Sequence, residues 1–71
     1  MRNCYIFRYE VPPRFSGSKC MAVDMPVDSH TTAEDVRQYL TACVATAEGY
    51  SDRNAEKEVR LLMISLVHHV Q

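Results

Sequence analysis

The chain has 71 residues, of which 46% are hydrophobic and 24% are charged, and its formal net charge is −1. This composition excludes an intrinsically disordered chain, and the length predicts one domain over residues 1–71. The near-neutral charge gives no overall reason to expect a nucleic acid or an anionic membrane as partner. A domain this small buries only about 60% of its unfolded surface, so its stability is marginal without further support.

Residues 3–11 predict the first strand, because aromatic and β-branched side chains alternate along them. Pro12 and Pro13 end this strand, since neither proline can donate a hydrogen bond to a ladder. In the loop that follows, Gly17 is the residue expected at positive φ. The side chains predicted to face the core are Tyr5, Phe7, Tyr9 and Val11.

Residues 19–27 predict a second strand, joined to the first as a hairpin. Met21, Val23 and Met25 alternate onto one face of this strand. Pro26 cannot lie inside a central ladder, so the end of this strand is expected at an edge of the sheet or outside it.

Residues 32–48 predict a helix. Thr31 and Glu34 fit a capping box at its start, and Gly49 stands where a left-handed residue commonly ends a helix. The apolar stripe at helical spacing consists of Val36, Tyr39, Leu40, Cys43, Val44 and Ala47.

Residues 51–71 predict a second helix that begins polar and ends in a nearly continuous apolar run. A further stripe of Leu61, Ile64 and His68 lies outside its main apolar face, so the end of this helix needs cover on most sides. The residues of the main face are Ala55, Val59, Leu62, Met63, Leu66, Val67 and Val70.

These elements predict an α+β fold in which a β-hairpin is followed by two antiparallel helices, in the order ββαα. A two-stranded hairpin leaves two open edges and is only marginally stable in water. Pairing one edge with a second copy would extend the sheet to four strands across a two-fold axis. A homodimer is therefore expected.

Cys4, Cys20 and Cys43 are odd in number and form no close pair, which is unlike a disulfide-framed secreted domain. The N-terminus lacks the pattern of a signal peptide, and the apolar runs are shorter than a membrane span. We expect a cytoplasmic protein with reduced thiols and no membrane partner.

The possible metal ligands also include His30, His68 and His69. Only the last two are close in sequence, and neighbouring residues of a helix point about 100° apart, so no metal or other cofactor is expected. No cysteine lies in a nucleophile motif, and two glycines cannot form a phosphate loop. The sequence therefore predicts a protein that is not an enzyme.

A small nucleic-acid-binding protein is the alternative, because Arg8, Arg14 and Lys19 flank the aromatic residues of the hairpin. The alternation turns the tyrosines inward and the basic residues are few, which makes nucleic acid the less favoured partner.

Protein binding is the function that the sequence favours. The long hairpin loop and the second apolar stripe have no evident use within the chain, and such residues are common in interfaces. We expect a non-catalytic, adaptor-like or inhibitor-like domain. Phage and mobile-element inhibitors of host systems, such as anti-CRISPR proteins, share its size and composition. The interface candidates are Arg14, Phe15, Leu61, Ile64 and His68.

Overall fold

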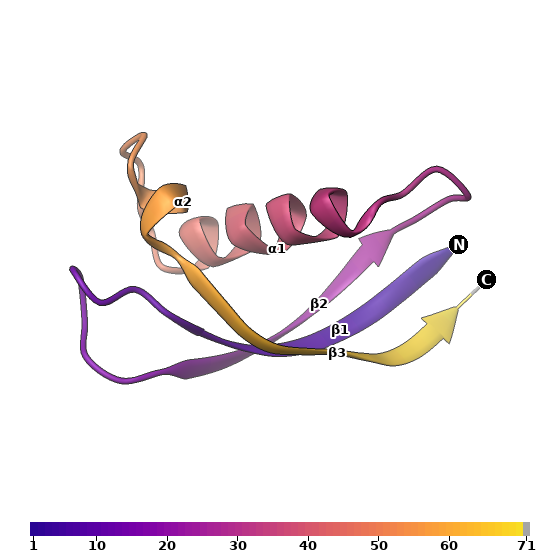
Figure 1. The fold of residues 1–71 in the computed structure, drawn as a ribbon, viewed down its shortest axis with the longest axis horizontal. Coiled ribbons are helices and arrows are strands. Elements are labelled where there is room, and N and C mark those ends of the chain that lie inside the picture. The colour runs from indigo at the N-terminus through magenta and orange to yellow at the C-terminus, as the bar shows by residue number, and fades with distance from the viewer. Residues whose placement is uncertain (71) are drawn as a thin grey trace.

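A three-stranded antiparallel sheet with one long helix on one face forms this molecule (Figure 1). The computed structural model describes the backbone of residues 1–70 and the side chains of residues 1–67. In chain order the elements are β1 (Arg2–Glu10), β2 (Lys19–Pro26), α1 (Ala33–Ala47), α2 (Ala55–Glu58) and β3 (Arg60–Val70).

β1 is the central strand of the sheet, whose order is β2-β1-β3. Both neighbours run antiparallel to β1 and therefore parallel to each other. The chain leaves β2, crosses one face of the sheet as α1, and returns as β3 on the far side of β1. The α+β class is thus confirmed, with a hairpin first and a strand–helix–strand crossover after it.

The predicted hairpin is confirmed, including the face that it buries. Phe7, Tyr9 and Val11 are almost fully buried, and Tyr5 packs against them. Pairing of Phe7 with Met21 places the apolar face of β2 on the same side of the sheet. Leu40 and Val44 of α1 complete this core, which is the reason that α1 lies across the hairpin.

The prolines and glycines that mark the ends of elements lie where the sequence predicted them. β1 ends before Pro12 and Pro13, and β2, which ends with Pro26, is an edge strand. Gly17 and Gly49 have φ angles of 82° and 78°, the left-handed conformation that favours glycine.

α1 occupies nearly the predicted residues, but its N-terminal cap lies one residue later than expected. The Thr32 hydroxyl accepts a hydrogen bond from the Asp35 backbone N–H, and the Asp35 carboxylate accepts one from the Thr32 N–H, both at 3.1 Å. Thr31 instead bonds to Asp28 in the preceding turn. The Thr31–Glu34 box was therefore wrong, because an equivalent pair of groups was available one residue further on.

The second long helix is the main error of the sequence-based prediction. Only Ala55–Glu58 is helical, and the apolar run that follows is the strand β3. Arg60 accordingly faces the neighbouring strand, and its Nη1 lies 3.6 Å from the Glu10 carboxylate across the sheet. The ββαα order is thus wrong, because β1 has two edges and the final segment pairs with the second one.

β3 is irregular along its pairing with β1. Ser65 pairs with Ile6 and Leu62 with Arg8, so two residues of β3 oppose Phe7 alone. Met63 lies in this bulge and has a φ angle of 52°, uncommon for a residue with a side chain. A second shift, at Val67, falls between the pairs that Tyr5 and Cys4 make with β3.

Candidate protein-binding surface

Exposed apolar side chains gather on β3. Among the side chains that the structure describes, eight large hydrophobic ones are exposed, and five of these belong to this one strand. Met63 is the most exposed, at 78%, followed by Leu66 and Val67 at 55% each. We call these five residues the β3 patch: Leu62, Met63, Ile64, Leu66 and Val67.

The patch has side chains on both faces of the sheet, because Leu62 pairs with Arg8 on the face opposite α1 and Leu66 lies on the α1 face. On the α1 face, the end of the patch is open because the helix is shorter than the sheet. A helix of 15 residues is about 22 Å long, whereas the longest dimension of the molecule is 37 Å. Leu61 pairs with Tyr9 and packs against the core. Leu66 pairs with Tyr5 on the same face of the sheet, yet more than half of its surface is exposed.

β3 is also an edge of the sheet, so one side of its backbone has no neighbouring strand in the sheet. The opposite edge, β2, ends in a proline and carries Lys19 and Asp24, which discourage pairing with another chain. β3 contains no acidic residue, and its edge is interrupted by the bulges at Met63 and Val67. The apolar residues of β3 thus lie beside an open but irregular backbone edge.

Leu61, Ile64 and residue 68 do not form the predicted helical stripe. All three positions lie on β3, where Leu61 is half-buried against the core and Ile64 is exposed within the patch. The backbone of His68 pairs with Cys4, and its side chain lies outside the described residues. Of the two stripe side chains that the structure describes, Ile64 is the one on the exposed surface.

Arg14 has partners within the chain, contrary to the premise on which it was selected. Its Nη2 lies 2.6 Å from the Asp52 carboxylate and its Nε 2.5 Å from the Glu58 carboxylate. The guanidinium also lies 4.3 Å from the centre of the Tyr50 ring. These hydrogen bonds, Asp52's first, raise the pKa of Arg14, so the residue remains a fixed positive charge.

Phe15 is likewise used within the chain. Its ring packs edge-to-face against Tyr9, with centroids 6.3 Å apart, and the Lys19 ammonium lies 4.4 Å from its centre. The loop of the hairpin is therefore tied to the core rather than presented as a free aromatic tip. That Arg14 and Phe15 take part in an interface stays a prediction. Both residues also hold the hairpin loop in place within the chain.

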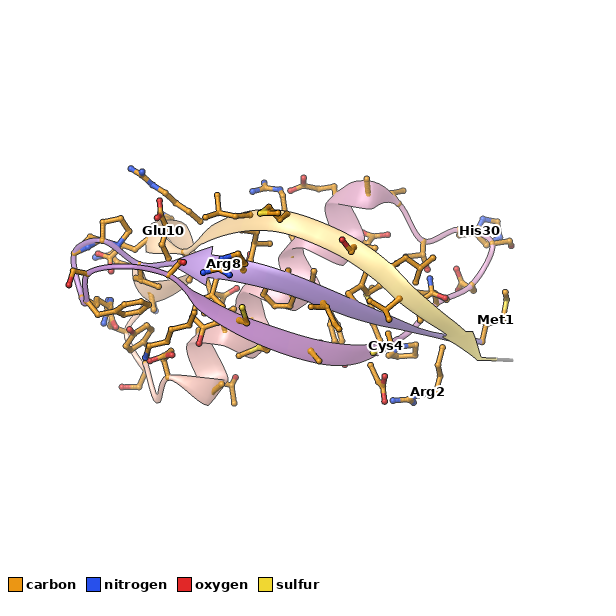
Figure 2. All side chains as sticks on the ribbon, turned by 90° about the horizontal axis from the view of Figure 1, so that it is seen from below. Met1, Arg2, Cys4, Arg8, Glu10 and His30 are labelled. Atoms are coloured by element: carbon orange, nitrogen blue, oxygen red, sulfur yellow. The ribbon has the colours of Figure 1, made fainter. Side chains whose placement is uncertain are left out.

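The basic hairpin does not present a free surface for nucleic acid. Arg14 is paired with two carboxylates, and Lys19 with the carboxylate of Glu48 at 3.1 Å. Tyr9, one of the expected stacking rings, is 97% buried, since only 3% of its surface is exposed. Arg8 lies on the sheet face opposite α1 and donates to the Ser18 hydroxyl (Figure 2). Arg14 and Lys19 also lie over the rings of Tyr50 and Phe15, so these two cations and these two rings already contact each other within the chain.

The three cysteines are free thiols on three different elements. Cys4 and Cys20 pair with Asp24 and Arg8 on the strands, and Cys43 lies on α1. Burial, followed by the Asp24 carboxylate, raises the pKa of Cys4, and burial alone raises that of Cys43. Both shifts disfavour the reactive thiolate.

Neither a metal cluster nor a membrane-spanning helix is found in the described part of the chain. Among those residues, no three His, Cys, Asp or Glu side chains come together in a way that could hold a metal ion. No described helix is long and apolar enough to cross a bilayer. Among the described side chains, a hollow of about 530 Å³ beside the start of α1 is lined by one carboxylate, Asp28, and by neither histidine nor cysteine.

Comparison of the chain with models of protein families, with curated proteins and with solved structures found no match. The candidate surface is therefore defined by its geometry alone.

The prediction from sequence missed Met63, Leu66 and Val67 as surface residues. It assigned them to the buried face of a helix, whereas they lie exposed on an edge strand. The available signal was the short apolar run from residue 61 to residue 67, which fits a strand as well as it fits a helix.

Proposed function

We propose that this chain is a small, non-catalytic protein-binding domain whose interface is the β3 patch. The observation that carries the proposal is the concentration of five of the eight exposed large apolar side chains on one edge strand. Exposed apolar patches of this kind mark binding sites, because covering them removes hydrocarbon from water.

The edge position adds a second source of affinity. A partner strand laid beside β3 would receive main-chain hydrogen bonds while the patch side chains enter its pockets. Full burial of a Leu, Ile, Val or Met side chain contributes about 1.5–3 kcal/mol. Partial burial of several of them contributes to the free energy of association, which also has to offset the cost of ordering the two partners.

An adaptor-like or inhibitor-like role is the corresponding biological proposal. It requires a surface and no cofactor, and the chain offers the β3 patch for that purpose. A phage or mobile-element inhibitor of a host system remains a prediction that rests on size and composition alone.

A charge placed in the patch tests this function. Leu66→Asp puts a carboxylate at a side chain that is 55% exposed, so the fold should persist. We expect affinity-capture mass spectrometry to show at least a ten-fold loss of bound partner relative to the wild type. Tyr39→Ser, which removes an exposed apolar side chain from α1, should leave capture unchanged.

Circular dichroism of both variants establishes that they are folded before capture is compared. Equal recovery of the same partners by wild type, Leu66→Asp and a second patch variant, Met63→Asp, would show that the patch is not the interface.

A further inference from the structure

A row of three residues with metal-ligand chemistry crosses the sheet on the face opposite α1. Asp24 of β2 and His68 of β3 both pair with Cys4 of β1, one on each side. We propose that these three residues bind a zinc ion, with the Cys4 thiolate, the His68 imidazole and the Asp24 carboxylate as its ligands. This inference goes beyond the proposed function, because it assigns a metal site to a different face of the sheet.

The reason for expecting no metal was the helix predicted over residues 51–71. In a helix, His68 and His69 would point about 100° apart and neither would be set beside another ligand. In the strand β3, neighbouring residues belong to opposite faces, and the register with β1 decides which histidine shares a face with Cys4. That residue is His68, since His69 pairs with Asn3.

The bulge at Val67 is what places His68 in this row. Leu66 pairs with Tyr5, so a regular ladder would set Val67 opposite Cys4. The extra residue shifts the register by one, and His68 takes that position instead. Bulges are common beside functional sites, where they redirect a side chain. The irregular pairing of β3 therefore brings a nitrogen donor to the thiol of the central strand.

The spacing of the row suits a single ion. Directly opposed residues of adjacent strands have Cβ atoms about 4.5–5.5 Å apart. Zinc binds a thiolate sulfur at about 2.3 Å and an imidazole nitrogen at about 2.0–2.1 Å, so a cysteine and a histidine at this spacing can share one ion. On the other side of Cys4, the Asp24 carboxylate is close enough to the thiol to raise its pKa, after the larger effect of burial.

The donor set favours zinc over harder cations. Calcium and magnesium are bound by oxygen ligands, whereas thiolate and imidazole are ligands that zinc prefers. Three protein ligands leave the fourth tetrahedral position for a water molecule.

An ion can reach this row from solvent, and the charges balance. Asp24 is exposed and Cys4 is half-buried on a face that neither α1 nor α2 covers (Figure 2). The thiolate and the carboxylate together offset both charges of the ion, and the thiol proton passes to solvent as the zinc–sulfur bond forms. Arg2, on the same face, is a long exposed side chain that can turn away from the ion.

Titration of the reduced full chain with Co²⁺ and with Zn²⁺ tests the site. We expect one ion per chain, and the cobalt complex should show the near-ultraviolet absorption of thiolate-to-metal charge transfer. Cys4→Ser should lose this absorption. In calorimetry, Cys4→Ser, Asp24→Asn and His68→Ala should each weaken zinc binding at least ten-fold. Cys20→Ser and His69→Ala are the matched controls, and both should bind zinc as the wild type does.

Circular dichroism of each variant establishes that it is folded before affinities are compared. No binding by the reduced wild type at a hundred-fold excess of Zn²⁺, or equal weakening in Cys4→Ser and Cys20→Ser, would overturn the site. Half an ion per chain would mean that two copies share the metal and would overturn binding within one chain. None of these measurements involves capture of a protein partner, so the metal site and the β3 patch stand or fall separately.

Discussion

At the scale of single residues, the contact between Tyr9 and Glu48 joins the sheet to the end of α1. The Tyr9 hydroxyl donates to the Glu48 carboxylate at 2.6 Å, and Lys19 donates to the same carboxylate at 3.1 Å. The Tyr9 hydrogen bond, and then that of Lys19, lowers the pKa of Glu48. The alternation of β1 predicted that Tyr9 is buried, but a partner 39 residues away could be found only in the folded chain.

Burial, followed by the hydrogen bond to Glu48, raises the pKa of Tyr9 from 10.0 to about 12. The folded state therefore retains the phenol proton more strongly than the unfolded state does. This contribution to stability is fully present below pH 10 and is lost as the pH rises toward 12. We expect urea midpoints of the wild type to fall across this interval and those of Tyr9→Phe to fall less.

Tyr39→Phe is the control for this experiment, because Tyr39 is exposed and its removal should leave the wild-type pH dependence in place. The same alkaline loss in Tyr9→Phe as in the wild type would mean that another group is responsible.

At the scale of elements, the start of α1 depends on Thr32. Thr32→Ala removes the hydroxyl that accepts from the Asp35 N–H and should cost about 1 kcal/mol of unfolding free energy. Thr46→Ala, at an exposed position of the same helix, should be neutral or slightly stabilising. Urea denaturation, followed by circular dichroism, measures the stability of both variants. Equal midpoints for the two variants would show that the Thr32 hydroxyl does not stabilise the start of α1.

The hairpin loop is held against the segment around α2 by Arg14. Arg14→Gln removes two ion pairs and the contact with the Tyr50 ring. We expect a fall in the melting temperature at low salt, because partly exposed ion pairs and cation–π contacts each contribute modestly to stability. Thermal denaturation should show a smaller loss at 1 M salt, where charges are screened.

Arg53→Gln changes an exposed arginine near the same segment and serves as the control. If Arg53→Gln lost as much stability as Arg14→Gln, the cause would be the change in net charge and not the loss of the contacts of Arg14.

β3 illustrates why the final segment was assigned to a helix. Leucine and methionine favour helices, and a run of seven residues satisfies the spacing of either element. The decisive partner was β1, whose second edge lies more than 50 residues away in the chain. Non-local pairing of this kind overrides local propensity, since each backbone group of β1 gains a hydrogen-bond partner.

At the scale of the whole molecule, the distribution of charge bears on the nucleic-acid alternative. Arg14 and Lys19, both within the first 20 residues, pair with carboxylates of the segment from residue 48 to residue 58. We therefore expect fluorescence anisotropy with a single-stranded oligonucleotide to show no binding tighter than about 100 µM at physiological salt, the weak end of non-specific affinity. Micromolar binding that falls steeply with salt and is reduced in Arg8→Ala would restore the alternative.

The sequence by itself determined the local features: the hairpin, its buried aromatic face, the extent of α1 and the two glycines at positive φ. Each follows from alternation, helical spacing or a single residue's allowed backbone conformation, all of which act over a few neighbours. The tertiary structure alone decided that the final apolar run is a strand, that Arg14 and Phe15 have internal partners, and that the β3 patch is exposed. These depend on which distant segment occupies the second edge of β1 and on how far one short helix can cover the sheet.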